Sequence, residues 1–125
     1  MENYKILIIE DDLILTLSLE LMLKKLNHNQ ITKVISGEKA IEAVELDPPN
    51  LMLVDIHLGK GITGIEAVKT IQKKYDIPAL YITGNSDAYN KKLTDNTDYV
   101  DYLVKPITFK ELQNALNKYS VKTDG

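Results

Sequence analysis

The strongest constraint on the fold is an alternation along the chain of short apolar runs with longer stretches of helical character. Short, continuously apolar runs are typical of parallel strands that are buried on both faces of a sheet. The runs are Ile6–Ile9, Ile31–Ile35, Leu51–Val54, Ala79–Ile82 and Val100–Val104, of which the second is the least apolar.

Helical patterns separate these runs and follow the last of them. They cover Leu13–Leu26, Gly37–Leu46, Thr63 to about Tyr75, the polar segment 87–98, and Thr108 to about Tyr119. The Thr-x-x-Glu spacing of a capping box marks the starts at Thr63 and Thr108. Five strand–helix units predict an α/β fold, a doubly wound parallel sheet with helices on both faces and ligands at the carboxyl ends of its strands.

The composition limits the class of protein. The 125 residues suit one domain, and a net charge of −3 gives no electrostatic reason to bind nucleic acid or an anionic membrane. The chain has no cysteine, no apolar run near the roughly 20 residues that cross a bilayer, and no signal-peptide pattern at its start. We therefore expect a cytoplasmic protein that binds neither nucleic acid nor membrane directly.

Polar residues follow four of the predicted strands at the point where each ends. Glu10 and Asp11 follow the first strand, Asp55 the third, Thr83 the fourth and Lys105 the fifth. The carboxyl ends of parallel strands meet at one edge of a sheet, so we expect these side chains to converge. Three carboxylates repel one another unless a cation intervenes, and their oxygens suit Mg²⁺. A carboxylate beside such an ion and a lysine can attack phosphorus, because the cations offset the charge of the incoming group.

Each of these residues also has an ordinary structural interpretation. Asp12 can cap the first helix, Thr83 before Gly84 can form a turn, and a lysine before proline is usually just solvated. A single group of this kind would predict nothing. Complementary groups at four strand ends favour a site for phosphoryl chemistry.

The motifs at the strand ends resemble those of the receiver domains of bacterial response regulators, and the resemblance extends from Lys5 to about Tyr119. The matching segments are IIED at 8–11, LMLVDI at 51–56, YITG at 81–84 and DYLVKP at 101–106. The family implies a flavodoxin-like receiver fold with five helices and strand order 2-1-3-4-5. It also implies one receiver domain over residues 1–120, followed by a polar tail or linker at 121–125.

The resemblance implies a metal-dependent phosphoacceptor. Asp55 would accept a phosphoryl group from a sensor histidine kinase or phosphotransfer protein of a two-component phosphorelay. Asp11, Asp55 and the backbone carbonyl of His57 would bind Mg²⁺, with Mn²⁺ as an alternative, and Glu10 would act through a bound water. The domain would be a signalling protein rather than an enzyme, with slow autophosphatase activity only.

The resemblance further implies a phosphate-sensing switch. Lys105 and the backbone amide of Gly84 would contact the phosphoryl oxygens, and the peptide bond after Lys105 would be cis. Thr83 would move toward the phosphate and Tyr102 would fill the vacated space. This would alter a surface over residues 87–118, where a homodimer partner or an output partner would bind.

Three features depart from the usual family pattern. Gly59 stands where many members have proline, and the loop that follows has one extra residue before Gly64, which predicts a more mobile loop. His57, two residues after the acceptor, would tune the phosphoryl lifetime or simply be exposed. The first helix has more leucines than one buried stripe needs, which leaves a partner face, a dimer face or scattered exposed leucines as interpretations.

Two other functions fit parts of the pattern. A Mg²⁺-dependent phosphatase with an aspartyl nucleophile would usually need a second acid two residues after Asp55, where this chain has His57. A pseudo-receiver that serves only as an interaction module would not need the intact acidic pair, Thr83 and Lys105. The partner kinase, the output, and the choice between a single-domain protein and part of a longer chain stay open at this point.

Overall fold

The computed structural model describes residues 4–84, 92 and 94–124. Its strands are β1 (Ile6–Ile9), β2 (Ile31–Val34), β3 (Leu51–Asp55), β4 (Ala79–Thr83) and β5 (Tyr99–Val104). Its helices are α1 (Leu13–Lys25), α2 (Gly37–Leu46), α3 (Gly64–Gln72) and α5 (Phe109–Asp124). Each of the five predicted strands is present, with its ends within one residue of the prediction.

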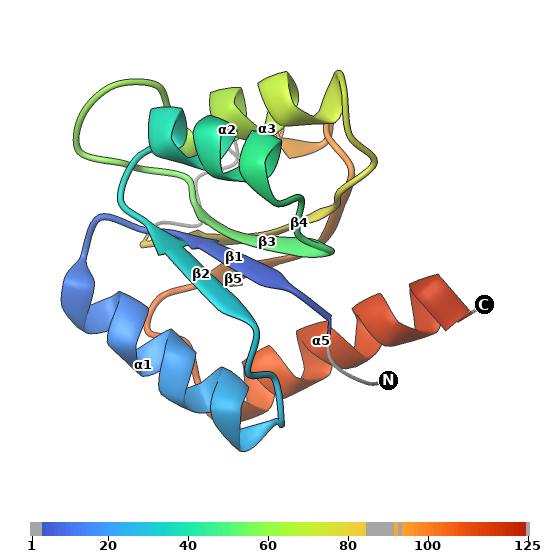
Figure 1. Cartoon of the computed structure of the whole chain (residues 1–125). Coiled ribbons are helices and arrows are strands. Elements are labelled where there is room, and N and C mark those ends of the chain that lie inside the picture. The colour runs from blue at the N-terminus through green and yellow to red at the C-terminus, as the bar shows by residue number, and fades with distance from the viewer. Residues whose placement is uncertain (1–3, 85–91, 93, 125) are drawn as a thin grey trace.

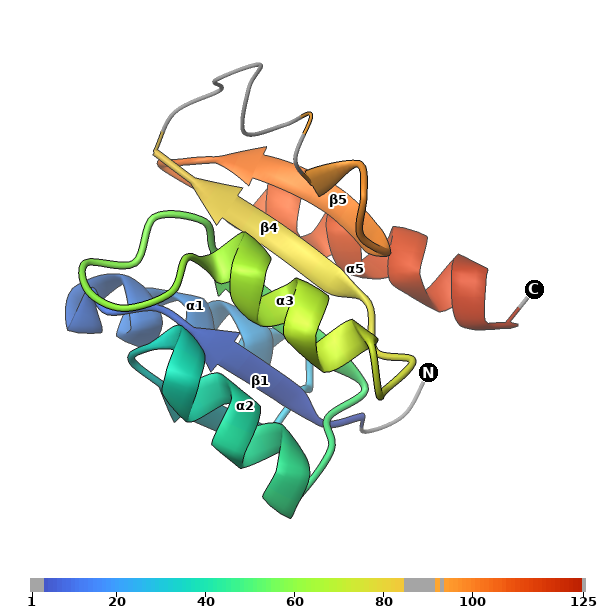
Figure 2. The same cartoon turned by 90° about the horizontal axis from the view of Figure 1, so that it is seen from above.

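The strands form one parallel sheet in the order β2-β1-β3-β4-β5, which confirms the predicted topology. Helices α2 and α3 cover one face and α1 and α5 the other (Figure 1). In the view from above, the strand ends, the start of α1 and the loop before α3 lie on the same side (Figure 2). The doubly wound α/β fold is therefore confirmed, and its carboxyl edge is assembled from segments far apart in the sequence.

Alternate strand residues separate two apolar clusters, because successive side chains of a strand point to opposite faces. Ile6 and Ile8 of β1 pack with α1 and α5, whereas Leu7 and Ile9 pack with α2 and α3. The side chains of the middle strand β3 also alternate between the two clusters, and the strand is buried along its whole length. This burial on both faces explains why the strands read as continuous apolar runs rather than as an alternating pattern.

The helix starts follow the predicted capping chemistry. The Thr63 hydroxyl accepts the Glu66 N–H and the Glu66 carboxylate accepts the Thr63 N–H, at 3.1 and 2.8 Å. Thr108 and Glu111 make the same pair of bonds at the start of α5. The Asp12 carboxylate accepts the N–H groups of two residues in the first turn of α1, so Asp12 is the cap of that helix.

The helix ends differ from the sequence prediction in two places. Helix α3 ends at Gln72 instead of near Tyr75, and the Gln72 side chain bonds to backbone atoms of Ile77 and Asp98. Helix α5 continues past Tyr119 to Asp124. Four helices are described against five predicted; half of the segment of the predicted fourth, 87–98, lies outside the described residues, and Lys92 and Thr94 within it are helical.

In the described ranges, no helix has both the length and the apolar composition that a membrane crossing requires.

Candidate phosphoacceptor and metal site

The pairing of β1 with β3 brings the acidic residues together. Ile9 lies beside Val54 in the parallel register, so Glu10 and Asp55 are neighbours at the carboxyl ends of adjacent strands. Asp11 is the next residue along the turn into α1. Carboxylate oxygens of Glu10, Asp11 and Asp55 all lie within 4.8 Å of one another. The predicted convergence of the three carboxylates is therefore present in the structure.

Lys105 brings the positive charge, from the end of β5. Its Nζ lies 3.3 Å from Asp55 Oδ2 and 3.4 Å from Glu10 Oε1. The peptide bond between Lys105 and Pro106 is cis, as the family resemblance implied. The Lys105 backbone N–H donates to the Thr83 carbonyl at 2.7 Å, which links the ends of β5 and β4.

The surroundings of Glu10 disfavour its ionised form. Glu10 is 2% exposed, and this burial raises its pKa from 4.5 to about 7. The neighbouring Asp55 acts in the same direction, while the Asp12 N–H and Lys105 act against it. Burial by itself would lower the pKa of Lys105, but the charges of Asp55 and Glu10 outweigh it and raise that pKa.

The carboxylate of Asp55 is held by different partners on its two oxygens. The side chain is 3% exposed; Oδ1 accepts the His57 N–H at 3.0 Å and Oδ2 faces Lys105. The side chain of His57 is exposed. These two contacts fix the orientation of the buried carboxylate.

The donor set fits a hard divalent cation. Three carboxylates supply oxygen ligands, as Mg²⁺ and Mn²⁺ prefer, and Glu10 Oε1 is buried without accepting a hydrogen bond. Asp11 is exposed, so one of the three carboxylates is open to solvent. Burial is the largest single influence on the pKa of Asp11 and raises it, but the Gly59 N–H and the Glu10 side chain act against burial, and the pKa lies below its usual value. A cation here would favour the ionised form of Glu10, which burial and the neighbouring Asp55 disfavour.

Backbone contacts in the 57–63 loop were not foreseen from the sequence. The Gly59 N–H donates to Asp11 Oδ2 at 2.8 Å, and the Ile62 N–H donates to Glu38 Oε2 at 3.0 Å. The loop predicted to be more mobile is thus bound to carboxylates at two points. The presence of Gly59 was the one sequence signal for the first contact, because a Cβ there would lie 2.8 Å from Asp11 Oδ2. Nothing in the sequence pointed to Glu38.

The predicted switch residues lie along β4 and β5. Thr83 is completely buried at the end of β4, in the strand next to Asp55. Gly84 follows it and is exposed. Tyr102 of β5 is half-buried and packs against the apolar cluster under α2 and α3. Of the predicted output surface, 87–118, residues 87–91 and 93 lie outside the described ranges.

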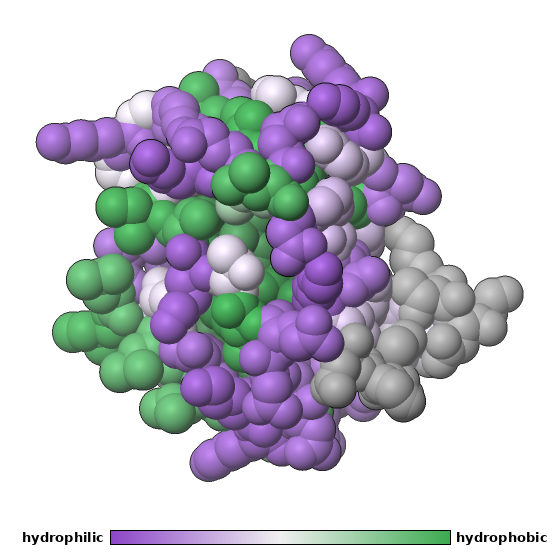
Figure 3. Space-filling view, viewed as in Figure 1, coloured by the Kyte–Doolittle hydropathy of each residue, from purple (hydrophilic) through white to green (hydrophobic). Residues whose placement is uncertain are grey.

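An exposed apolar face of α1 begins next to the site. Leu13, Ile14, Leu17 and Leu21 are each more than half exposed, whereas Leu19 and Leu23 are buried against the sheet. The corresponding hydrophobic surface is visible over α1 at the lower left of Figure 3. The excess of leucines noted in the sequence is therefore a surface feature of the helix.

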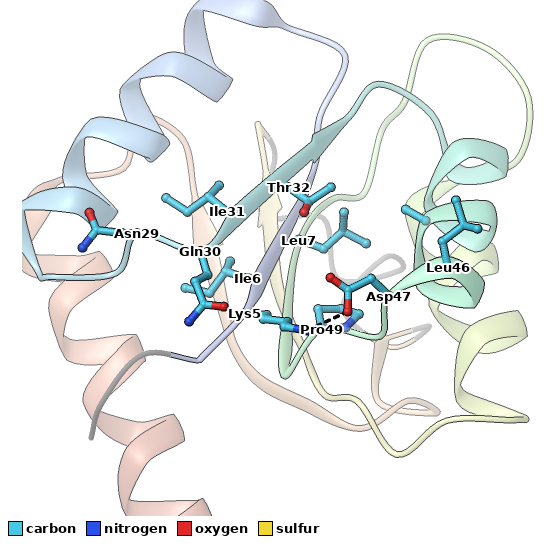
Figure 4. A pocket seen from close by; sticks show the side chains of 11 residues that line it. Lys5, Ile6, Leu7, Asn29, Gln30, Ile31, Thr32, Leu46, Asp47 and Pro49 are labelled. Carbon is cyan, nitrogen blue, oxygen red and sulfur yellow. Dashed lines mark hydrogen bonds and ion pairs between the residues drawn. The ribbon is translucent and has the colours of Figure 1, made fainter.

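A separate hollow of about 400 Å³ lies at the opposite, amino-terminal end of the strands. Lys5, Gln30 and Asp47 are among its lining residues, and a 2.6 Å ion pair joins Lys5 to Asp47 (Figure 4). Its charged groups are paired with each other rather than directed at a ligand, so the carboxylate cluster remains the candidate site.

Comparison with known proteins assigns the family. Residues 6–117 match the family model described as response regulator receiver domain. The chain is 28% identical over 123 residues to the transcriptional regulatory protein YvrH of Bacillus subtilis, covering 98% of this chain and 52% of that protein. This chain therefore belongs to the response regulator receiver domain family.

Two solved receiver domains illustrate the likeness. The PhyR receiver domain of Erythrobacter litoralis superposes with a TM-score of 0.80 at 31% identity, covering 97% of this chain and 92% of that chain. The receiver domain of a sensor histidine kinase from Pseudomonas aeruginosa superposes with a TM-score of 0.82 at 26% identity, covering 94% and 97%. The latter has a magnesium ion coordinated in its active-site cleft. The chain spans about half of the length of the first curated relatives that it matches.

Proposed function

We propose that this receiver domain accepts a phosphoryl group on Asp55 from the phosphohistidine of a sensor kinase or phosphotransfer protein, in the cytoplasm. The observation that supports this most directly is the setting of Asp55. Its buried carboxylate lies within 4.8 Å of two other carboxylates and 3.3 Å from the Lys105 ammonium. Such a cluster is unfavourable by itself and becomes favourable with a divalent cation and a phosphoryl group.

The reaction is a phosphoryl transfer between two side chains. An Asp55 oxygen forms a bond to phosphorus as the bond from phosphorus to the donor imidazole nitrogen breaks, and the imidazole leaves with that electron pair. Bound Mg²⁺, or Mn²⁺, would supply positive charge against the phosphoryl oxygens. Lys105 would exchange its contact with Asp55 for one with a phosphoryl oxygen, and the Gly84 amide would donate to another.

The same groups account for loss of the signal. A water oxygen attacks phosphorus, the bond from phosphorus to the Asp55 oxygen breaks, and the products are inorganic phosphate and the free carboxylate. We expect this self-hydrolysis to be slow. His57, whose side chain is exposed, would set the access of water to the phosphoryl group.

The response would be a shift between two conformations of one surface. The Thr83 hydroxyl would turn toward the phosphoryl group, and the Tyr102 ring would move from its half-buried position into the space released. Residues 87–118 would carry the change to a homodimer partner or an output partner, because β5 and α5 adjoin Tyr102 and Lys105.

The exposed apolar face of α1 would bind the phosphodonor protein. It starts two residues after Asp11, so a donor docked on it would have its phosphohistidine near Asp55. Leu17→Glu should slow phosphotransfer from a phosphohistidine protein and leave phosphorylation by acetyl phosphate unchanged. Leu46→Glu is the matched control, since Leu46 is 87% exposed at the end of α2. Equal slowing by both substitutions would contradict this docking face.

The function is tested by incubating the chain with acetyl phosphate. We expect about one phosphoryl group per chain, stable in acid and labile in base, in the presence of Mg²⁺ and none with a chelator. Failure to incorporate phosphate with Mg²⁺ present would leave the alternative of a pseudo-receiver. Multiple-turnover hydrolysis of phosphate esters would instead indicate an aspartyl phosphatase.

A further inference from the structure

The β3–α3 loop, residues 57–63, is attached to two different parts of the molecule. At its middle, the Gly59 N–H donates to Asp11 Oδ2 at 2.8 Å. Near its end, the Ile62 N–H donates to Glu38 Oε2 at 3.0 Å. The first attachment involves a proposed metal ligand, and the second involves a helix residue outside the cluster. The loop therefore connects α2 to the metal site.

The Glu38 contact is closely fitted. Glu38 is the second residue of α2, where a negative charge is favoured by the helix dipole. Its carboxylate lies against Gly61, which has a φ of 78°, so a Cβ at Gly61 would collide with both carboxylate oxygens. The Ile62 side chain packs just as closely on Gly37, where an added Cβ would lie 2.6 Å from Ile62 Cγ1. The end of the loop is thus fixed to the first turn of α2 by a hydrogen bond and by packing.

The loop positions two groups that face the metal site. The His57 N–H holds Asp55 Oδ1, and the Gly59 N–H holds Asp11 Oδ2. Hydrogen bonds to a ligating carboxylate fix its orientation, and their loss typically weakens metal binding by roughly 10- to 100-fold. A group that fixes the loop should therefore affect the orientation of the same two carboxylates indirectly, through the loop backbone.

We propose that Glu38 is a positioning residue for the metal site: by holding the Ile62 N–H it keeps the 57–63 loop in the conformation that orients Asp11 and Asp55 for a divalent cation. This inference rests on the metal site of the proposed function. Glu38 does not touch the cation, and it acts through the backbone of the loop.

Three substitutions separate this role from a general charge effect. Glu38→Ala removes both the charge and the hydrogen-bond acceptor. Glu38→Gln removes the charge but keeps a carbonyl oxygen at the same distance along the side chain. Glu42→Ala is the matched control, because Glu42 is on the same helix and its exposed carboxylate forms an ion pair with the exposed Lys39, at 3.8 Å.

The measurement is the Kd for Mg²⁺, obtained from amide chemical-shift titrations of the unphosphorylated protein. We expect Glu38→Ala to raise the Kd by about fivefold, less than the effect of losing a direct ligand partner. The Kd values of Glu38→Gln and Glu42→Ala should each stay within about twofold of that of the unaltered chain, because the hydrogen bond from the Ile62 N–H remains in both. In the metal-free protein, hydrogen exchange of the Ile62 amide should accelerate in Glu38→Ala and not in Glu38→Gln.

Each other outcome has a definite meaning. An unchanged Kd in Glu38→Ala overturns the positioning role, even if that variant melts at a lower temperature. Equal weakening by Glu38→Gln and Glu38→Ala shows a charge effect and also overturns it. If the unaltered chain does not bind Mg²⁺, the metal site of the proposed function is itself wrong. That result differs from an unchanged Kd in Glu38→Ala, which contradicts only the positioning role of Glu38.

Discussion

Replacing Glu10 by glutamine should stabilise the metal-free protein, and increasingly so as the pH rises. Glu10 is 2% exposed, and burial together with Asp55 raises its pKa from 4.5 to about 7. The folded chain therefore binds the Glu10 proton more tightly than the unfolded chain does. Stability from this group is fully present below about pH 4.5 and is lost as the pH rises through about 7. Glutamine has no such dependence.

The size of the effect follows from the two pKa values. The interval from 4.5 to about 7, at 1.36 kcal/mol for each pH unit, corresponds to roughly 3.4 kcal/mol when Glu10 is fully ionised. Between pH 5 and pH 8 the linkage relation gives about 2.5 kcal/mol of that change. The free energy of unfolding of Glu10→Gln relative to the unaltered chain should therefore increase by about 2.5 kcal/mol over this range.

The assay is urea unfolding of both proteins at pH 5 and pH 8 in the presence of a chelator. Comparing the difference at two pH values removes any constant effect of the glutamine amide, such as its contact with Lys105. Adding Mg²⁺ at pH 8 should stabilise the unaltered chain more than the variant, because the cation binds the folded state through the carboxylates. A difference that is the same at both pH values would refute the proposal that Glu10 is strained by burial in the cluster.

Two further predictions concern the scaffold of the site, and a third concerns the buried His28. Gly64→Ala should destabilise the chain by about 2 kcal/mol or more in urea unfolding, because a Cβ at Gly64 would collide with the Asp55 carbonyl oxygen; a neutral result would mean that the loop has room to shift. Thr63→Ala should cost about 1 kcal/mol by the same assay through loss of the cap on the Glu66 N–H, and an effect below about 0.3 kcal/mol would argue against the capping box. Burial lowers the pKa of His28 below 6.5, so the unfolded chain binds the His28 proton more tightly than the folded chain does. The free energy of unfolding should therefore fall as the pH drops below 6.5 and through the pKa of the folded state. His28→Gln should have a shallower loss of stability from pH 6.5 to pH 5 in urea unfolding, and an unchanged slope would contradict the neutral, buried state of His28.

Much of the fold could be predicted because local and global signals agree. The continuous apolar runs at β1, β3 and β4 indicated strands buried on both faces, and all three are buried along their length. The capping boxes at Thr63 and Thr108 marked the starts of α3 and α5, since the cap is formed between residues three apart.

The helix ends could not be predicted because they depend on distant contacts. Helix α3 stops at Gln72, whose side-chain amide donates to Ile77 and Asp98 and accepts from the Asp98 N–H, 26 residues further along the chain. A pattern of apolar residues over 63–75 contains no information about that partner.

The same distinction holds at the candidate site. The convergence of Glu10, Asp11, Asp55 and Lys105 followed from their positions at strand ends, because parallel strands present those ends at one edge. The contact of Glu38 with Ile62 joins residues 24 apart through a loop whose course was not predictable. Side chains at element ends are placed by topology, whereas backbone contacts of a loop are placed by its detailed conformation.

The central claim is that Asp55 is the phosphoacceptor, and the most direct test compares two substitutions in one phosphorylation assay. Asp55→Asn and Asp12→Asn each remove one carboxylate near the site, and asparagine caps a helix as well as aspartate does, so α1 should be preserved in the second variant. With acetyl phosphate and Mg²⁺, intact-protein mass spectrometry should show one added phosphoryl group on the unaltered chain and on Asp12→Asn, and none on Asp55→Asn. Full phosphorylation of Asp55→Asn would contradict the account.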